Sequence, residues 1–371
     1  MRKGILIAGY YGAGNTGDEA ILSGMLTALR TQGIENITVL SRNPEETRAL
    51  HGVDSIPCGR RQEGLIAVYR QLRHSQLFIL GGGGLLQDHT SRVVPYWLSR
   101  VALALAAGTP VMYYAQGVGP LKTGKAQKLV GFISNKVRYI TVRDEGSRHL
   151  LQDLGVDQVP LEVTADPALG IKLTSEGREL LKGAAGVSFS QDKINVAVSL
   201  RSWDGDKEYL PVLVEALEGL RRQFPLRYVF FPFQYGCDEQ VSKVVMESLS
   251  GEGDCMVCGK HSPEQIAAML REMDAVIAMR LHAVILSALS GVPAFGLVYD
   301  PKVKCFMERA GLADYFIAVE ELPGNGELLL SRLAGWLLER TSVSKGMKPK
   351  IKEMVSLAER NAVIVRQLVK L

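Results

Sequence analysis

The stretch that decides the fold is DAVIAMRLHAVILSALSGVPAFGLVYDPKVK, from Asp274 to Lys304. Short β-branched apolar runs bounded by Gly and Pro are typical of parallel strands buried on both faces. The pattern predicts a strand, a helix, a second strand and the start of a second helix. Arg280 and His282 then lie at the first strand-to-helix junction, and Lys302 lies at the second. Ligands of parallel sheets bind at the carboxyl ends of strands, beside helix N-termini, so we expect an anion there.

Composition sets the broad class of the protein. The chain has 371 residues, of which 47% are apolar and 22% charged, enough for two globular domains of ordinary size. The net charge of +4 favours an acidic small molecule or an anionic surface and is too small to indicate nucleic acid. Five cysteines, with Cys255 and Cys258 as a close pair, suggest core thiols in a reducing compartment rather than a disulfide framework or a zinc site. The N-terminus has no recognisable signal peptide, so we expect a cytoplasmic protein. The sequence also has no cluster of ligand residues that requires a metal, so we expect no metal site.

A glycine-rich loop follows the first predicted strand, residues 4–9. Gly12, Gly14 and Gly17 match the dinucleotide fingerprint G-x-G-x-x-G between a strand and a helix. Asp18 and Glu19, however, lie in the first helical turn, where their charge repels a pyrophosphate. The second predicted strand, residues 36–40, also lacks an acidic residue for a ribose. We therefore expect no nicotinamide cofactor.

Polar residues near the ends of the predicted strands in the first half suit a neutral, hydroxyl-rich ligand, because amides and carboxylates bind sugar hydroxyls. The run Gly81–Gly84 allows a ligand, or simply another segment of backbone, to approach closely. The candidates for binding such a ligand are Asn15, Thr16, Asp18, Gly83, Asp88 and Gln116.

Strands and helices alternate along most of the chain, which is typical of doubly wound α/β domains. The alternation loosens between residues 166 and 195. We predict an N-terminal domain at 1–170, a linker at 171–194, a C-terminal domain at 195–345 and an amphipathic C-terminal helix at 346–371. The helix either packs back on the first domain or rests its basic face on a membrane surface.

The second half gathers basic residues at its predicted strand ends. Guanidinium groups bind phosphate and carboxylate groups in a bidentate fork, so a small trianionic ligand fits this edge. The basic residues are Arg201, Lys260, His261, Arg280, His282 and Lys302.

Several motifs together resemble the polysaccharide pyruvyl transferase family, in particular its bacterial cell-wall branch. Their joint occurrence in this order is more specific than any one of them. The motifs are GNTGDEAIL at 14–22, GGGGLLQD at 81–88, QGVGP at 116–120, RDEGS at 143–147 and MRLHAVILSALSGVP at 279–293.

The resemblance implies a GT-B-like architecture, with two Rossmann-like domains facing across a cleft. It also implies phosphoenolpyruvate as donor and substrate, with no cofactor. The acceptor would be an N-acetylmannosamine residue of a lipid-linked secondary cell-wall polymer precursor, and the product a 4,6-linked pyruvate ketal plus phosphate. Arg280, Leu281 and His282, together with Arg201, would bind the donor. Lys302 joins this set from its place at a strand end.

The charges suggest roles for these residues. Arg201, Arg280 and Lys302 would hold the phosphate and carboxylate of the donor, and protonated His282 would donate its proton. Asp18 or Asp88 would act as the base for a sugar hydroxyl. We assign the catalytic set to His282, Arg280 and Asp18.

Two other functions fit the sequence. A sugar-nucleotide glycosyltransferase of cell-envelope synthesis shares the architecture, because fold does not fix chemistry. A non-catalytic glycan-binding protein would use the same hydroxyl-binding loops, but neutral sugars do not need clustered cations.

Overall fold

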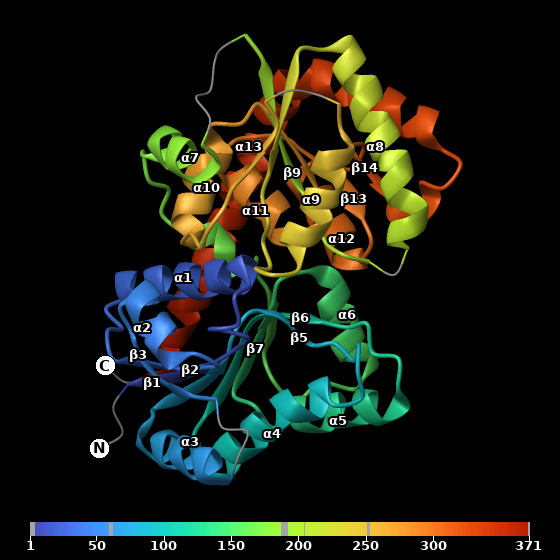
Figure 1. Ribbon diagram of the computed structural model, residues 1–371. Helices are drawn as coiled ribbons and strands as arrows, with labels where there is room; N and C mark the ends of the chain where they lie inside the picture. Colours follow the sequence, from blue (N-terminus) through green and yellow to red (C-terminus); the bar gives the residue numbers. More distant parts are fainter. Residues whose placement is uncertain (1–3, 59–61, 187–191, 204, 251–252, 370–371) are drawn as a thin grey trace. The chain divides into compact units, whose positions relative to one another are not determined.

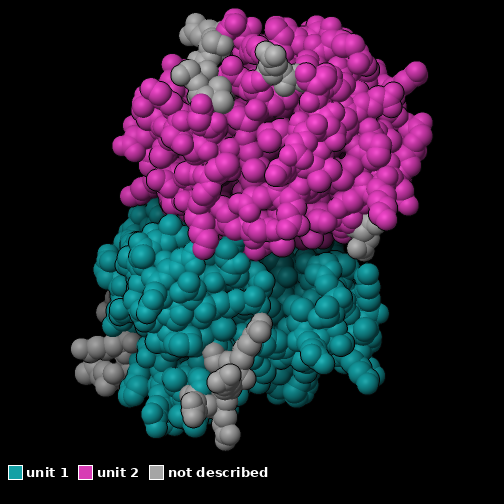
Figure 2. Space-filling model, in the orientation of Figure 1, with its two compact units in different colours: residues 1–14, 18–171, 354–371 teal, residues 15–17, 172–353 magenta. Residues whose placement is uncertain are grey.

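The chain forms two compact units in the computed structural model, which describes residues 4–369 except 59–61, 187–191, 204 and 251–252. Unit 1 comprises Met1–Gly14, Asp18–Ile171 and Met354–Leu371, and unit 2 comprises Asn15–Gly17 and Lys172–Glu353. Figure 2 colours the two units separately. Each unit contains a parallel β-sheet with helices in the connections between strands (Figure 1).

The sheet of unit 1 has the order β3-β2-β1-β4-β6-β7-β8, with β5 paired to β6. The strand order reverses between β1 and β4. The strands are β1 (Ile5–Ala8), β2 (Ile37–Ser41), β3 (Asp54–Pro57), β4 (Leu77–Leu80), β5 (Gly83–Leu86), β6 (Val111–Val118), β7 (Tyr139–Val142) and β8 (Leu161–Val163). The helices are α1 (Thr16–Thr31), α2 (Pro44–His51), α3 (Gln62–His74), α4 (Val93–Ala106), α5 (Gly124–Ser134) and α6 (Glu145–Asp153), with a 3₁₀ turn at Pro167–Gly170.

The sheet of unit 2 has the order β11-β10-β9-β12-β13-β14. This is the 3-2-1-4-5-6 order of the Rossmann fold, with its reversal between β9 and β12. The strands are β9 (Ile194–Ser199), β10 (Leu226–Phe230), β11 (Cys255–Met256), β12 (Ala275–Ala278), β13 (Ala294–Val298) and β14 (Phe316–Ala318). The helices are α7 (Gly177–Ala185), α8 (Asp206–Gln223), α9 (Asp238–Ser248), α10 (Pro263–Arg271), α11 (Leu281–Leu289), α12 (Pro301–Ala310) and α13 (Gly326–Leu368), with a 3₁₀ turn at Val319–Glu321.

The strand-helix-strand-helix pattern predicted for residues 274–304 is confirmed as β12, α11, β13 and α12. Every residue of β12 and β13 is buried, as expected for strands covered on both faces. The helix α10 begins with the capping box at Ser262 and Gln265, which fixes its N-terminus.

Two segments differ from the boundaries expected from sequence. The stretch 171–194, expected to be a linker, contains helix α7. Gly177 of α7 lies against Ala268 of α10, so closely that a Cβ at Gly177 would come within 2.1 Å of the Ala268 carbonyl oxygen. The C-terminal helix begins at Gly326, well before residue 346.

The end of α13 packs on the sheet of unit 1, as predicted for the C-terminal helix. Side chains of a strand alternate between its two faces. Ile140 and Val142 of β7 belong to the core cluster that includes α3, α4 and α5. Thr141, between them, faces the other way and bonds to Asn361 of α13.

Asn361 ties this helix to the sheet through buried hydrogen bonds. Its Oδ1 accepts from the hydroxyls of Thr141, at 2.5 Å, and Thr164, at 3.0 Å. The side chains on this side of the helix, including Met354, Ala358, Ala362 and Val365, are buried. The apolar face of the helix is therefore covered by protein. No helix in the described part of the chain is long and apolar enough to cross a membrane.

We expect the substitution Asn361→Ala to destabilise unit 1 by about 1 kcal/mol, because it removes the shorter acceptor of the buried hydroxyls of Thr141 and Thr164 and leaves them the backbone carbonyls of Tyr113 and Val142. Urea unfolding followed by circular dichroism measures the change. The control is Gln367→Ala, an exposed position on the same helix, which should stay within about 0.5 kcal/mol of the parent chain. Equal stabilities for the two variants would show that the Asn361 bonds contribute little.

Candidate functional site

The topology of unit 2 brings three predicted cations to one edge of its sheet. Arg201 follows β9, Arg280 follows β12 and Lys302 follows β13. These strands are neighbours, and the order reverses between β9 and β12. Ligands of open parallel sheets bind outside such a reversal, at the carboxyl ends of the strands. Leu281 begins α11 and is buried, so it anchors the helix start on which His282 stands.

Arg280 is held by a buried carboxylate. Its Nε donates to Asp238 Oδ2 at 2.9 Å, and its Nη2 donates to Asp238 Oδ1. Asp238 is fully buried and also accepts from the backbone N–H of Phe233 and Gln234. This bidentate pair fixes the plane of the guanidinium group. The Arg280 side chain remains 17% exposed, so its outer N–H groups stay accessible to a ligand.

Tyr299 connects the other two cations. Arg201 Nη1 donates to the Tyr299 hydroxyl at 2.8 Å, and its guanidinium carbon lies 4.5 Å from the centre of that ring. Lys302 Nζ lies 5.8 Å from the same ring centre and 3.0 Å from Asp300 Oδ2.

Charge in this site is only partly balanced. Asp238 and Asp300 balance Arg280 and Lys302. Arg201 has no carboxylate within ion-pair distance in the described residues. The edge of the sheet therefore keeps positive charge for an anion.

The segment Asn15–Gly17 is part of unit 2, although it begins α1. Asn15 Nδ2 donates to Gln234 Oε1 at 2.8 Å, and Asn15 Oδ1 accepts from the Gly17 N–H at 2.9 Å. The Thr16 N–H donates to the Phe233 carbonyl. Asn15 and Thr16, which the sequence predicts to bind a sugar, thus lie with the predicted donor-binding residues, and both polar groups of the Asn15 amide bond to protein.

Gly17 packs directly against the imidazole ring of His282. A Cβ at Gly17 would lie 2.2 Å from His282 Nδ1, which is far inside van der Waals contact. Only glycine allows this approach of backbone to ring. The position of His282 is therefore set by the backbone of the α1 N-terminus as well as by α11.

In unit 1 the structure brings together Asp18, Gly83 and Gln116. The Gln116 amide Nε2 donates to the Gly83 carbonyl, and a Cβ at Gly83 would lie 3.5 Å from Asp18 Oδ1. Gln116 is fully buried, and within the described part of the chain its Oε1 has no hydrogen-bond partner. Ala115, just before it, has a φ of 46°, a left-handed conformation that a non-glycine residue rarely adopts. Such backbone strain is common at functional sites.

The carboxylate of Asp88, a further candidate, is bonded to the loop at Lys122 and Thr123. Its carboxylate accepts from the backbone N–H of Lys122 at 2.7 Å and of Thr123 at 2.8 Å, and from the Thr123 hydroxyl. Burial raises the pKa of Asp88, but these hydrogen bonds outweigh burial and hold the pKa below its ordinary value. A carboxylate with a lowered pKa is a weaker base, so Asp88 suits a loop-holding role better than proton abstraction.

Glu19 fills the glycine-rich loop of unit 1. Its Oε1 accepts from the Gly12 N–H at 2.8 Å, and its Oε2 lies 2.8 Å from His51 Nε2. The loop N–H that a dinucleotide pyrophosphate would use is thus bonded to a protein carboxylate.

The close cysteine pair carries no sign of a metal site. Cys255 and Cys258 are free thiols, and burial raises the pKa of Cys255 to about 11. In the described ranges no three His, Cys, Asp or Glu side chains cluster closely enough to hold a metal ion.

Sequence reasoning missed Asp238, Tyr299 and Asp300, which hold the three cations. Asp300 precedes Pro301 and caps α12 through the Lys302 N–H, a recognisable helix-start signal. Asp238 is the first residue of α9, but its pairing with Arg280 depends on the fold and has no local signal.

Comparison with known proteins identifies the family. Residues 15–301 match the family described as polysaccharide pyruvyl transferase. The amylovoran biosynthesis protein AmsJ of Erwinia amylovora is 20% identical over 370 residues, covering 86% of this chain and 88% of that protein.

Solved structures share the fold at low identity. A UDP-GlcNAc 2-epimerase from Methanocaldococcus jannaschii superposes with a TM-score of 0.69 and 14% identity, covering 99% of both chains. A glycosyltransferase from Rickettsia africae does so with a TM-score of 0.63 and 13% identity, covering 99% of this chain and 98% of that one. The fold is GT-B-like, as predicted. Because residues 15–301, most of the chain, match the polysaccharide pyruvyl transferase family, the chain belongs to that family.

Proposed function

We propose that this transferase moves the pyruvyl group of phosphoenolpyruvate onto an N-acetylmannosamine residue of a lipid-linked secondary cell-wall polymer precursor. The product is a 4,6-linked pyruvate ketal, and phosphate is released. The observation that carries the proposal is the set of Arg201, Arg280, His282 and Lys302 on one sheet edge in unit 2. We place the reaction in the cytoplasm, at the inner face of the membrane that holds the lipid-linked acceptor. It needs no cofactor, because phosphoenolpyruvate is itself a substrate.

The donor is proposed to bind through its charges. Arg201, which has no carboxylate partner in the described residues, takes the donor phosphate together with the outer N–H groups of Arg280. The Lys302 ammonium group adds positive charge for the donor carboxylate. Because Asp238 and Tyr299 hold the two guanidinium groups in place, little reorganisation is needed when charge develops on the phosphate.

The chemical steps follow from this arrangement. Protonated His282 gives its proton to the methylene carbon of the donor, and the neighbouring carbon becomes oxocarbenium-like. One sugar hydroxyl attacks that carbon and loses its proton to a base, for which Asp18 is the candidate. The C–O bond to phosphate then breaks, a second hydroxyl closes the ketal, and its proton leaves with the phosphate or restores His282. One phosphoenolpyruvate and two hydroxyls thus give one ketal and one phosphate.

We expect the purified chain to release phosphate from phosphoenolpyruvate only when an N-acetylmannosamine-containing lipid-linked disaccharide is present. Mass spectrometry of the acceptor should show the gain of one pyruvyl group. Turnover of a UDP-sugar without this gain would contradict the proposal and favour a glycosyltransferase. Release with a different sugar acceptor would retain the reaction and replace only the acceptor.

For His282→Ala we expect turnover to fall by roughly 10²- to 10⁴-fold, the usual contribution of a general acid. The affinity for phosphoenolpyruvate, measured separately by calorimetry, should change by less than about tenfold. His74→Ala, an exposed histidine on α3, serves as the matched control. Undiminished turnover in His282→Ala would exclude the catalytic role.

The contact between Gly17 and His282 gives a second test of the same residue. Gly17→Ala introduces a Cβ that must push the imidazole aside, so turnover should fall by about tenfold or more. Gly346→Ala is the control, because a Cβ there meets no atom within 4 Å. If Gly17→Ala keeps full turnover while remaining folded, the ring position is not important for the reaction.

A further inference from the structure

We propose that a cavity in unit 1 binds an anionic saccharide, meaning a sugar ring that bears a phosphate or carboxylate group. The inference rests on the proposed function in one respect, because it takes this saccharide to be part of the acceptor. It adds that the acceptor carries a negative charge, and that residues outside the five motifs bind it.

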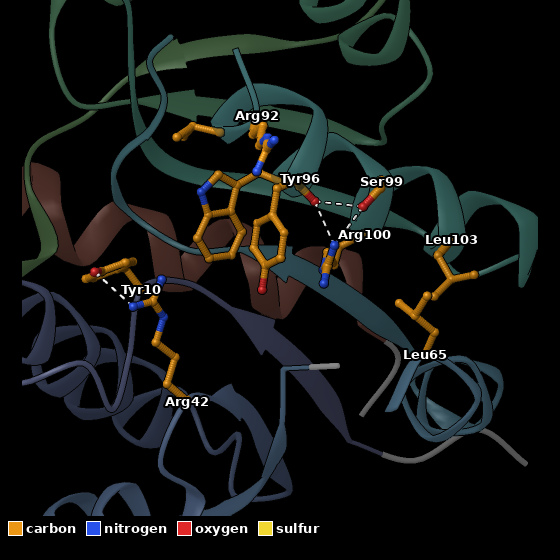
Figure 3. A pocket seen from close by; sticks show the side chains of 10 residues that line it. Tyr10, Arg42, Leu65, Arg92, Tyr96, Ser99, Arg100 and Leu103 are labelled. Carbon is orange, nitrogen blue, oxygen red and sulfur yellow. Dashed lines mark hydrogen bonds between the residues drawn. The ribbon is translucent and has the colours of Figure 1, made fainter. Parts of the chain in front are cut away.

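The cavity lies at the carboxyl edge of the unit 1 sheet. Its volume is about 660 Å³, within the range of small-molecule sites. Tyr10 comes just after β1 and Arg42 just after β2, while α4 and Leu65 of α3 supply most of the remaining lining (Figure 3). The lining residues are Tyr10, Arg42, Leu65, Arg92, Val93, Tyr96, Trp97, Ser99, Arg100 and Leu103.

The charge of the cavity is positive. Arg42, Arg92 and Arg100 line it, and none of the lining residues that the structure describes is acidic. Arg100 is only 6% exposed, and its hydrogen bonds include three to the neutral oxygens of Cys58, Tyr96 and Ser99. Charge in a partly desolvated site interacts more strongly than charge in water. An anion is therefore the favoured guest.

Two tyrosine rings of the cavity hold two of its arginines in place. The guanidinium carbon of Arg100 lies 3.6 Å from the Tyr96 ring centre, and that of Arg42 lies 4.3 Å from the Tyr10 ring centre. Stacking of this kind orients the guanidinium groups before a ligand arrives.

Hydroxyl partners are also present. The Tyr10 hydroxyl accepts from Arg42 and can still donate to a ligand. Trp97 packs edge-on to Tyr96, with ring centres 4.9 Å apart, and adds an apolar surface for the C–H face of a pyranose. A sugar ring with an adjacent anionic group uses the rings and the arginines together.

The test measures binding to the full chain by isothermal titration calorimetry, and needs no turnover. The probes are glucuronic acid, glucose 1-phosphate, glucose, inorganic phosphate and UDP. We expect at least one of the two anionic sugars to bind about tenfold or more tightly than glucose and than inorganic phosphate. Comparison of the two shows whether the preferred anionic group is a carboxylate or a phosphate.

The variant that tests the site is the double substitution Arg42→Gln with Arg92→Gln, at two exposed arginines that keep the size of the side chain. It should lose the tenfold preference for the anionic sugar. Arg73→Gln, an exposed arginine of α3 outside the cavity, should keep it. Equal thermal midpoints for the variants and the parent chain show that the fold is intact.

Binding at the cavity is the part of the measured binding that the double variant loses, because the cations of unit 2 also bind phosphate. The proposal is overturned if, in that part, glucose or inorganic phosphate binds as tightly as both anionic sugars, or if the double variant keeps the preference. Tighter binding of UDP that the double variant abolishes would also overturn it, in favour of a nucleotide site. Failure of phosphate release from phosphoenolpyruvate, with the sugar preference intact, would contradict the proposed function and leave this site standing.

Discussion

The ion pair between Arg280 and Asp238 is the interaction on which the second unit's edge depends. A fully buried carboxylate is costly unless it is paired and hydrogen-bonded, and Asp238 meets both needs at once. Through Phe233 and Gln234 it shapes the loop after β10, and that loop in turn bonds to Asn15 and Thr16. Arg280 and the start of α1 are therefore linked through one network of hydrogen bonds.

The same fold occurs in proteins with different chemistry. The structural relatives include UDP-GlcNAc 2-epimerases and a glycosyltransferase, at identities too low to transfer function. The chemistry of this chain must therefore be read from its own side chains. Glu19 takes the loop N–H that could face a pyrophosphate, and cations stand at the reversal of the second sheet. Chemistry in this architecture is decided at strand ends, while the sheets supply a common frame.

Sequence patterns predicted the parts of the fold that local physics determines. Continuous apolar runs marked β12 and β13. The strand β5 was missed because its first residues are glycines, which have low strand propensity, and its pairing to β6 is long-range. Arg280 and His282 were identified from their place after a strand. Their contacts with Asp238 and Gly17 could not be predicted from the sequence, because those two residues are distant from them along the chain.

The discontinuity of unit 1 constrains how the chain is made. Domains generally fold as they emerge during synthesis, the N-terminal one first. Here the first sheet obtains Asn361, the partner of Thr141 and Thr164, only after all of unit 2 has been translated. Until then, the apolar surface later covered by the end of α13 is exposed on the nascent first unit. That interval is when this protein is most open to chaperone binding or to misassociation.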